Sequence, residues 1–116
     1  MKTILELNAD QFDPALNAAR MPVLVDFYAP WCGPCKLLTP LLETLAGQFD
    51  GRIQFFKVNV DVAPQLAERF EISAVPTLLL INQGEVCEVI VGFPSPRVIV
   101  GKLEAIAVAD AVEVRL

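Results

Sequence analysis

Apolar residues recur along this chain with two spacings, and each spacing predicts one kind of secondary structure. Short runs that are apolar, or that alternate with polar residues, predict β-strands at residues 3–7, 23–29, 53–60, 78–81 and 85–91. The run at 23–29 is apolar at odd and even positions alike, apart from Asp26, which is typical of a strand covered on both faces of a sheet. Asn82-Gln83-Gly84 separates the last two runs and predicts an antiparallel hairpin.

Between these runs, apolar residues three and four positions apart predict helices. The predicted helices begin after Asn8, at Cys32, at Pro64 and at Pro96. Asn8 and Gln11 have the spacing of a capping box, in which each side chain accepts a hydrogen bond from the other residue's backbone. Proline is favoured in a first helical turn because its missing N–H costs nothing there.

The order of these elements predicts an α/β fold. Strands separated by helices pair in parallel through right-handed crossovers, whereas the final hairpin is antiparallel. We therefore expect a central mixed β-sheet flanked by helices on both faces. With 116 residues, of which 54% are hydrophobic, the chain suits a single domain over residues 1–116. Residues 112–116 alternate between apolar and charged side chains, which predicts a short terminal strand packed on the domain or on a neighbouring chain.

Charge excludes some classes of partner. The net charge is −5, and lysine and arginine form no cluster, so we expect no binding to nucleic acid or to an anionic membrane surface. Glu6 interrupts the apolar residues near the N-terminus, and no apolar run approaches the length of about 18 residues that spans a bilayer. We expect a soluble, cytoplasmic protein.

The candidate chemistry lies in Trp31-Cys32-Gly33-Pro34-Cys35-Lys36. Cysteines three positions apart share a helix face and can close a disulfide. Gly33 and Pro34 predict that the helix begins here, so Cys32 should lie at its N-terminus. Free N–H groups and the positive end of the helix dipole stabilise a thiolate at that position, and Lys36 adds a positive charge. We therefore expect Cys32 to be the nucleophile and Cys35 to be more buried.

Other interpretations of the three cysteines remain open. Cys32 and Cys35 could be half of a metal site shared by two chains, or inert core thiols. The chain has no histidine, so one copy cannot supply the four ligands of a closed zinc site, and we expect neither a metal nor a cofactor. Cys87 lies in the second hairpin strand, where we predict a small buried apolar residue, an exposed thiol being the alternative.

The six-residue motif, preceded by residues 23–29 and followed by Val75-Pro76-Thr77, resembles the thioredoxin family. The resemblance covers about residues 3–107 and leaves residues 108–116 as a C-terminal extension. It implies a thioredoxin fold and a protein-disulfide reductase that works by dithiol–disulfide exchange. A binding or chaperone-type module that holds client proteins, with secondary redox activity, is the alternative.

The resemblance also implies roles for residues outside the motif. Asp26 would be a buried general base for Cys35, with Lys57 beside it to tune its proton affinity. From sequence alone, Asp26 could instead lie at a sheet edge with its carboxylate in water. Lys57 could be an ordinary exposed strand residue. The family further implies a cis peptide bond between Val75 and Pro76.

Substrate binding is implied for a further set of positions: Trp31, Gly33, Pro34, Val75, Pro76, Gly92 and Phe93. The chain departs from the commonest family pattern at four positions, and we expect these to affect the choice of partner rather than the chemistry: Tyr28, where tryptophan is usual, Pro30, Ala74 and Phe93. The implied partners are protein disulfides and a thioredoxin reductase, either an NADPH-dependent flavoprotein or a ferredoxin-linked one. Neither of those cofactors belongs to this chain, which we expect to be a monomer.

Overall fold

The computed structural model describes the backbone of residues 2–115 and the side chains of residues 2–110. The strands are β1 (Leu5–Glu6), β2 (Val23–Tyr28), β3 (Gln54–Asn59), β4 (Thr77–Asn82) and β5 (Glu85–Val91). The helices are α1 (Ala9–Ala18), α2 (Gly33–Gln48), α3 (Pro64–Arg69) and α4 (Pro96–Arg115). Each of the first five predicted strands and four predicted helices is present, with ends that differ by a few residues.

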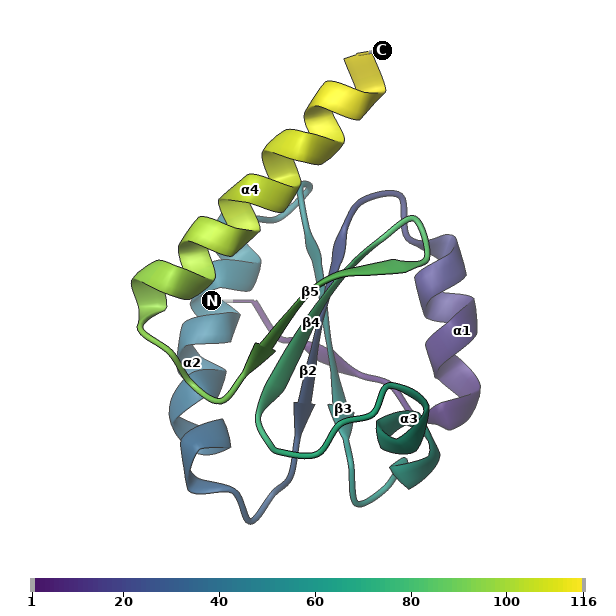
Figure 1. Cartoon of the computed structure of the whole chain (residues 1–116), viewed down its shortest axis with the longest axis vertical. Helices are drawn as coiled ribbons and strands as arrows, with labels where there is room; N and C mark the ends of the chain where they lie inside the picture. Colours follow the sequence, from purple (N-terminus) through teal and green to yellow (C-terminus); the bar gives the residue numbers. More distant parts are fainter. Residues whose placement is uncertain (1, 116) are drawn as a thin grey trace.

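The strands form one mixed sheet in the order β1-β3-β2-β4-β5. β1, β3 and β2 run parallel, while β4 is antiparallel to β2 and to β5. Helices cover both faces, with α2 and α4 on one side and α1 and α3 on the other (Figure 1). The predicted α/β architecture is confirmed, and β2 lies at the centre of the sheet, where its residues are buried from both sides.

Each face of the sheet has its own apolar core. Side chains from α2 and α4 pack against Leu24 and Leu78, whereas those of α1 and α3 pack against Val25 and Phe27. Side chains alternate between the two faces along a strand, so Asp26 points to the same face as Leu24, which is the face covered by α2. The sheet therefore directs the carboxyl of Asp26 toward the helix that carries Cys35.

The helix starts follow the predicted local chemistry. Asn8 caps α1: its side chain accepts a hydrogen bond from the Gln11 N–H at 2.9 Å, and the Gln11 side chain accepts one from the Asn8 N–H at 3.0 Å. Pro64 occupies the first turn of α3, and Cys32 is the N-cap of α2.

The strand predicted for residues 112–116 is wrong as far as residue 115, because α4 continues to Arg115. After Gly101 no glycine or proline interrupts the sequence, so nothing ends the helix, and four alternating residues are too few to override it. The predicted packing of this segment and the whole of Leu116 lie outside the described residues. The long helix projects beyond the body of the domain (Figure 1).

The prediction that Cys87 is buried is also wrong, because its thiol is free and exposed. β5 is the edge strand of the sheet, and its pairing with β4 shifts between Leu80 and Ile81. Leu80 pairs with Glu88 and Ile81 with Val86, so Cys87 is the extra residue of a β-bulge. Val86, Val89 and Val91 of the same edge strand are exposed as well, so Cys87 faces solvent because little covers this strand.

Candidate active site

Cys32 and Cys35 lie where the chain leaves β2 and enters α2. The Cys32 N–H donates to the Ala29 carbonyl at 3.1 Å, which turns the chain into the helix. The two cysteines form a disulfide with their Cα atoms 5.3 Å apart. Both are buried, Cys35 at 2% exposure and Cys32 at 4%, in the predicted order. Gly33 and Pro34 are exposed in the first turn of the helix.

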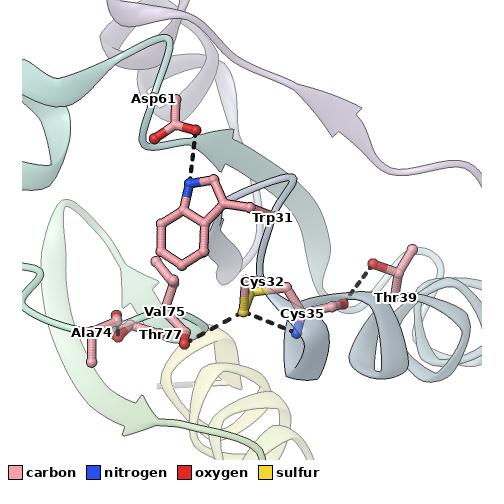
Figure 2. The surroundings of a disulfide bond; sticks show 8 residues. All are labelled: Trp31, Cys32, Cys35, Thr39, Asp61, Ala74, Val75 and Thr77. Carbon is pink, nitrogen blue, oxygen red and sulfur yellow. Dashed lines mark hydrogen bonds between the residues drawn. A yellow bond between two sulfur atoms is a disulfide. The ribbon is translucent and has the colours of Figure 1, made fainter.

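Two backbone groups approach the sulfur of Cys32 (Figure 2). The Cys35 N–H donates to Cys32 Sγ at 3.2 Å, which is the N-cap hydrogen bond of α2. The carbonyl oxygen of Val75 lies 3.6 Å from the same sulfur. A thiolate at Cys32 would therefore have a donor already in place, and a thiol could donate to Val75. The Val75–Pro76 peptide bond is cis, as the resemblance implied.

Trp31 stands beside the cysteines as an exposed side chain, with 70% of its surface accessible. Its indole N–H donates to the Asp61 carboxylate at 3.1 Å, which fixes the ring (Figure 2). The ring forms one wall of an open, mainly apolar pocket of about 250 Å³ whose other walls are Val60, Ala67, Ile72, Ser73, Ala74 and Val75. This pocket brings together Trp31 and Val75 from the predicted binding set.

The rest of that set is more dispersed. Gly92 has a φ of 81°, in the left-handed region that favours glycine, and its N–H donates to the Pro76 carbonyl at 2.8 Å. This hydrogen bond ties the loop after β5 to the cis-proline loop. Phe93 is 36% exposed and is not one of the pocket walls.

Asp26 is buried, with 3% of its surface exposed, and its Oδ1 atom has no hydrogen-bond partner. Burial raises the pKa of its carboxyl from 3.8 to about 7, an effect that the positive charge of Lys57 partly offsets. The position at a solvated sheet edge, which sequence alone left open, is excluded. A carboxyl with a pKa near neutrality can accept and return a proton at physiological pH.

Lys57 is half-buried and pairs in register with Asp26 across β3 and β2. Its Nζ atom lies 5.6 Å from the centroid of the Tyr28 ring. Tyr28 in turn donates its hydroxyl hydrogen to the Glu6 carboxylate and packs against the cluster of Ala29, Cys32 and Cys35. The lysine side chain is thus held within the site, and is no ordinary exposed strand residue.

Sequence reasoning missed Tyr28, Glu6 and Asp61 as parts of this site. Tyr28 could have been found from strand alternation, because it lies two residues after Asp26 and so faces the same side of the sheet. Asp61 follows β3, whose carboxyl end lies at the same sheet edge as that of β2. Glu6 offered no signal, because its role depends on the register between β1 and β3.

A Cys-x-x-Cys pair at a helix N-terminus of an α/β fold, with a hydrogen-bond donor beside the first sulfur, defines a thiol–disulfide oxidoreductase that works by dithiol–disulfide exchange. Comparison with known families gives the same result: the model of the family described as Thioredoxin matches residues 3–105. The chain belongs to the thioredoxin family and has the thioredoxin fold. Neither the described residues nor the similar proteins favour the client-binding alternative.

Individual relatives are similar over most of the chain. A thioredoxin of Staphylococcus haemolyticus is 49% identical over 90 residues, which cover 78% of this chain and 85% of that protein. A thioredoxin of Haemophilus influenzae is 40% identical over 92 residues, which cover 79% of this chain and 86% of that protein. The chloroplastic M-type thioredoxin of Spinacia oleracea is 39% identical over 92 residues, which are 79% of this chain and only 51% of that protein. The chain thus spans about half the length of the spinach relative.

No helix among the residues that the structure describes is both long and apolar enough to cross a membrane.

Proposed function

We propose that this chain reduces disulfide bonds in other proteins, with Cys32 as the attacking thiolate and Cys35 as the resolving thiol. The observation that carries the proposal is the surroundings of Cys32 Sγ, where the Cys35 N–H lies at 3.2 Å and the Val75 carbonyl at 3.6 Å. The N–H at a helix N-terminus stabilises negative charge on the sulfur. The sulfur of Cys35 does not lie at the N-cap, because Cys35 belongs to the first turn of α2.

In the first step, the Cys32 thiolate attacks one sulfur of the substrate disulfide. The substrate S–S bond breaks, a mixed disulfide forms to Cys32, and the other substrate sulfur leaves as a thiolate that takes a proton from water. In the second step, Asp26 accepts the proton of Cys35. The Cys35 thiolate then attacks Cys32 Sγ, the internal disulfide forms, and the second substrate thiolate leaves. Two electrons pass from the dithiol to the substrate.

The carboxyl of Asp26 suits the second step because its pKa is raised to about 7. A general base is most effective when its pKa lies near the working pH. Lys57, paired with Asp26 in register, keeps that pKa from rising further. Asp26 points to the sheet face covered by α2, and we place it beneath Cys35 on that ground.

The substrate would dock as an extended segment along the cis-proline loop. Its apolar side chains would enter the pocket between Trp31 and Val75, and its backbone could pair with that of Val75. We assign the remaining contacts to the other residues of the predicted binding set: Gly33, Pro34, Pro76, Gly92 and Phe93. Phe93 is the exposed aromatic ring of this set, and aromatic side chains often anchor such contacts.

Recycling requires two electrons from outside the chain. We propose that a thioredoxin reductase supplies them, drawing on NADPH through a flavin or on ferredoxin, and that the protein acts as a monomer in the cytoplasm. Bacterial relatives named thioredoxin support the general scheme.

Turnover of a protein disulfide such as insulin, with the chain recycled by reductase and NADPH, tests the proposal. The wild type should accelerate reduction over the uncatalysed rate, whereas Cys32→Ser should not. A matched control is Cys87→Ser, which also removes one thiol but lies on the edge strand, and it should retain wild-type turnover. Equal rates for the wild type and Cys32→Ser would contradict the proposal.

A further inference from the structure

A row of charged side chains crosses three neighbouring strands below the active site. Glu6 of β1 pairs in register with Lys57 of β3, and Lys57 pairs in register with Asp26 of β2. Residues in register on parallel strands project to the same face of the sheet. Lys57 therefore has a carboxylate on each side, the exposed one of Glu6 and the buried one of Asp26.

Tyr28 contacts two members of this row, Glu6 and Lys57. Its hydroxyl donates to the Glu6 carboxylate, and the side chain of Asn59, its register partner on β3, also bonds to the phenol. The ring faces Lys57 Nζ at 5.6 Å from its centroid, within the range of a cation–π contact. The other side of the residue packs against the Cys32–Cys35 cluster.

The ion pairs among the described residues do not include Lys57. Its ammonium group thus forms an ion pair with neither Glu6 nor Asp26, its two acidic neighbours in register, although its positive charge lowers the pKa of Asp26. The phenol takes the place of the lysine as a donor to the Glu6 carboxylate. Burial and the Glu6 carboxylate raise the pKa of Tyr28 to about 12, so the phenol keeps its proton over the working range.

We propose that Tyr28 is a positioning residue for the resolving step: by engaging Glu6, it leaves the positive charge of Lys57 to Asp26. This inference rests on the proposed role of Asp26 as base. The sequence leads us to expect an effect of Tyr28 on the choice of partner, and the proposed role in the chemistry goes beyond that expectation.

The proposal gives opposite signs for two substitutions. In Tyr28→Phe the ring stays but Glu6 loses its donor, so the Glu6 carboxylate draws Lys57 away from Asp26, and the pKa of Asp26 rises. In Glu6→Gln the competing charge is gone, so the pKa of Asp26 falls. The other neighbours of Asp26 are unchanged in both variants: Cys35 of α2, which the proposed function places above it, and the apolar Leu78 that pairs with it from β4. Loosened packing alone would move the pKa of Asp26 in the same direction in both variants.

The test is an NMR titration of the Asp26 side-chain carboxyl carbon in the reduced protein. We expect Tyr28→Phe to raise the Asp26 pKa by about 0.5 or more and Glu6→Gln to lower it by a few tenths. The double variant should match Glu6→Gln, because the phenol has no carboxylate left to engage. Glu68→Gln removes an exposed carboxylate on α3, across the sheet, and should leave the Asp26 pKa unchanged.

The rate at which the mixed disulfide is released should follow the titration. Its pH midpoint should rise in Tyr28→Phe and fall in Glu6→Gln, as the pKa of Asp26 does. Unchanged Asp26 pKa values, or shifts of the same sign in Tyr28→Phe and Glu6→Gln, would overturn the role of Tyr28 while leaving the proposed function intact. A wild-type release rate with no pH dependence near 7 would overturn the role of Asp26, and the role of Tyr28 with it.

Discussion

Replacing Asp26 by alanine should make the protein more stable at neutral pH while slowing its chemistry. The carboxyl of Asp26 is buried with one oxygen unpaired, and burial raises its pKa from 3.8 to about 7. Below pH 3.8 the carboxyl is protonated in both the folded and the unfolded chain, so it contributes nothing. Between the two pKa values only the unfolded chain gives up the proton, so the stability of the folded state falls as the pH rises. Above about pH 7 the penalty is complete.

The size of the penalty follows from the pKa values. A pKa difference of one corresponds to about 1.4 kcal/mol, so a rise from 3.8 to about 7 costs the folded state about 4 kcal/mol above neutrality. Alanine removes this cost but leaves a small cavity, which we put at about 1 to 2 kcal/mol from large-to-small substitutions in cores. Asp26→Ala should therefore gain about 2 to 3 kcal/mol at pH 8. At pH 4 little of the penalty has developed, and the gain should disappear.

Urea unfolding of the oxidised protein at pH 4, 6 and 8 measures both quantities, with the two variants compared at each pH. The difference between them should change by about 3 to 4 kcal/mol from pH 4 to pH 8, a quantity from which the cavity cost cancels. Glu68→Ala, which removes an exposed carboxylate, serves as the control and should show little pH dependence. If Asp26→Ala were less stable than the wild type at pH 8, or if the difference did not grow with pH, Asp26 would not be a strained carboxylate.

Three further predictions follow from the site and the fold. Cys35→Ser should accumulate mixed disulfides with proteins of a cell extract on non-reducing gels and Cys32→Ser should not; equal trapping would reverse our assignment of the two sulfurs. The oxidised native protein should react with a thiol reagent at Cys87 alone, giving about one thiol per chain that Cys87→Ser abolishes, because Cys87 is its free cysteine and is exposed. Asn8→Ala should lower the free energy of unfolding by about 1 kcal/mol, since it removes the capping box of α1, and an unchanged denaturation midpoint would argue that solvent replaces the cap.

The sequence predicts most of the fold because its local signals agree with one another. Asn8 with Gln11, and proline at the starts of α3 and α4, define the helix ends, and the double-sided apolar run around Asp26 identifies the central strand. The cis peptide before Pro76 is different. Only about 5% of X-Pro bonds are cis, so the residues alone gave no reason to expect one, and the prediction came from family resemblance.

The errors come from interactions that the local pattern does not contain. Cys87 is exposed because β5 is the edge strand of the sheet, and no feature of residues 85–91 predicts that position. Residues 112–115 alternate between apolar and charged side chains as a strand would. They continue α4 instead, because extending a helix that has already nucleated costs little free energy per residue. The hydrogen bond from Tyr28 to Glu6 could not be predicted, because it reaches β1, and the register between distant strands cannot be read from either strand alone.

The donor to the Cys32 sulfur is a backbone amide, that of Cys35. Changing a side chain cannot delete a backbone amide, except by placing a proline at position 35, and that change would also remove the resolving thiol. Nucleophile activation and the second chemical step thus depend on one residue, and a single substitution that abolished the first would abolish the second. The surface around the pocket is under no such constraint. Its side chains can vary and adapt the protein to new partners while the sulfur chemistry is inherited intact.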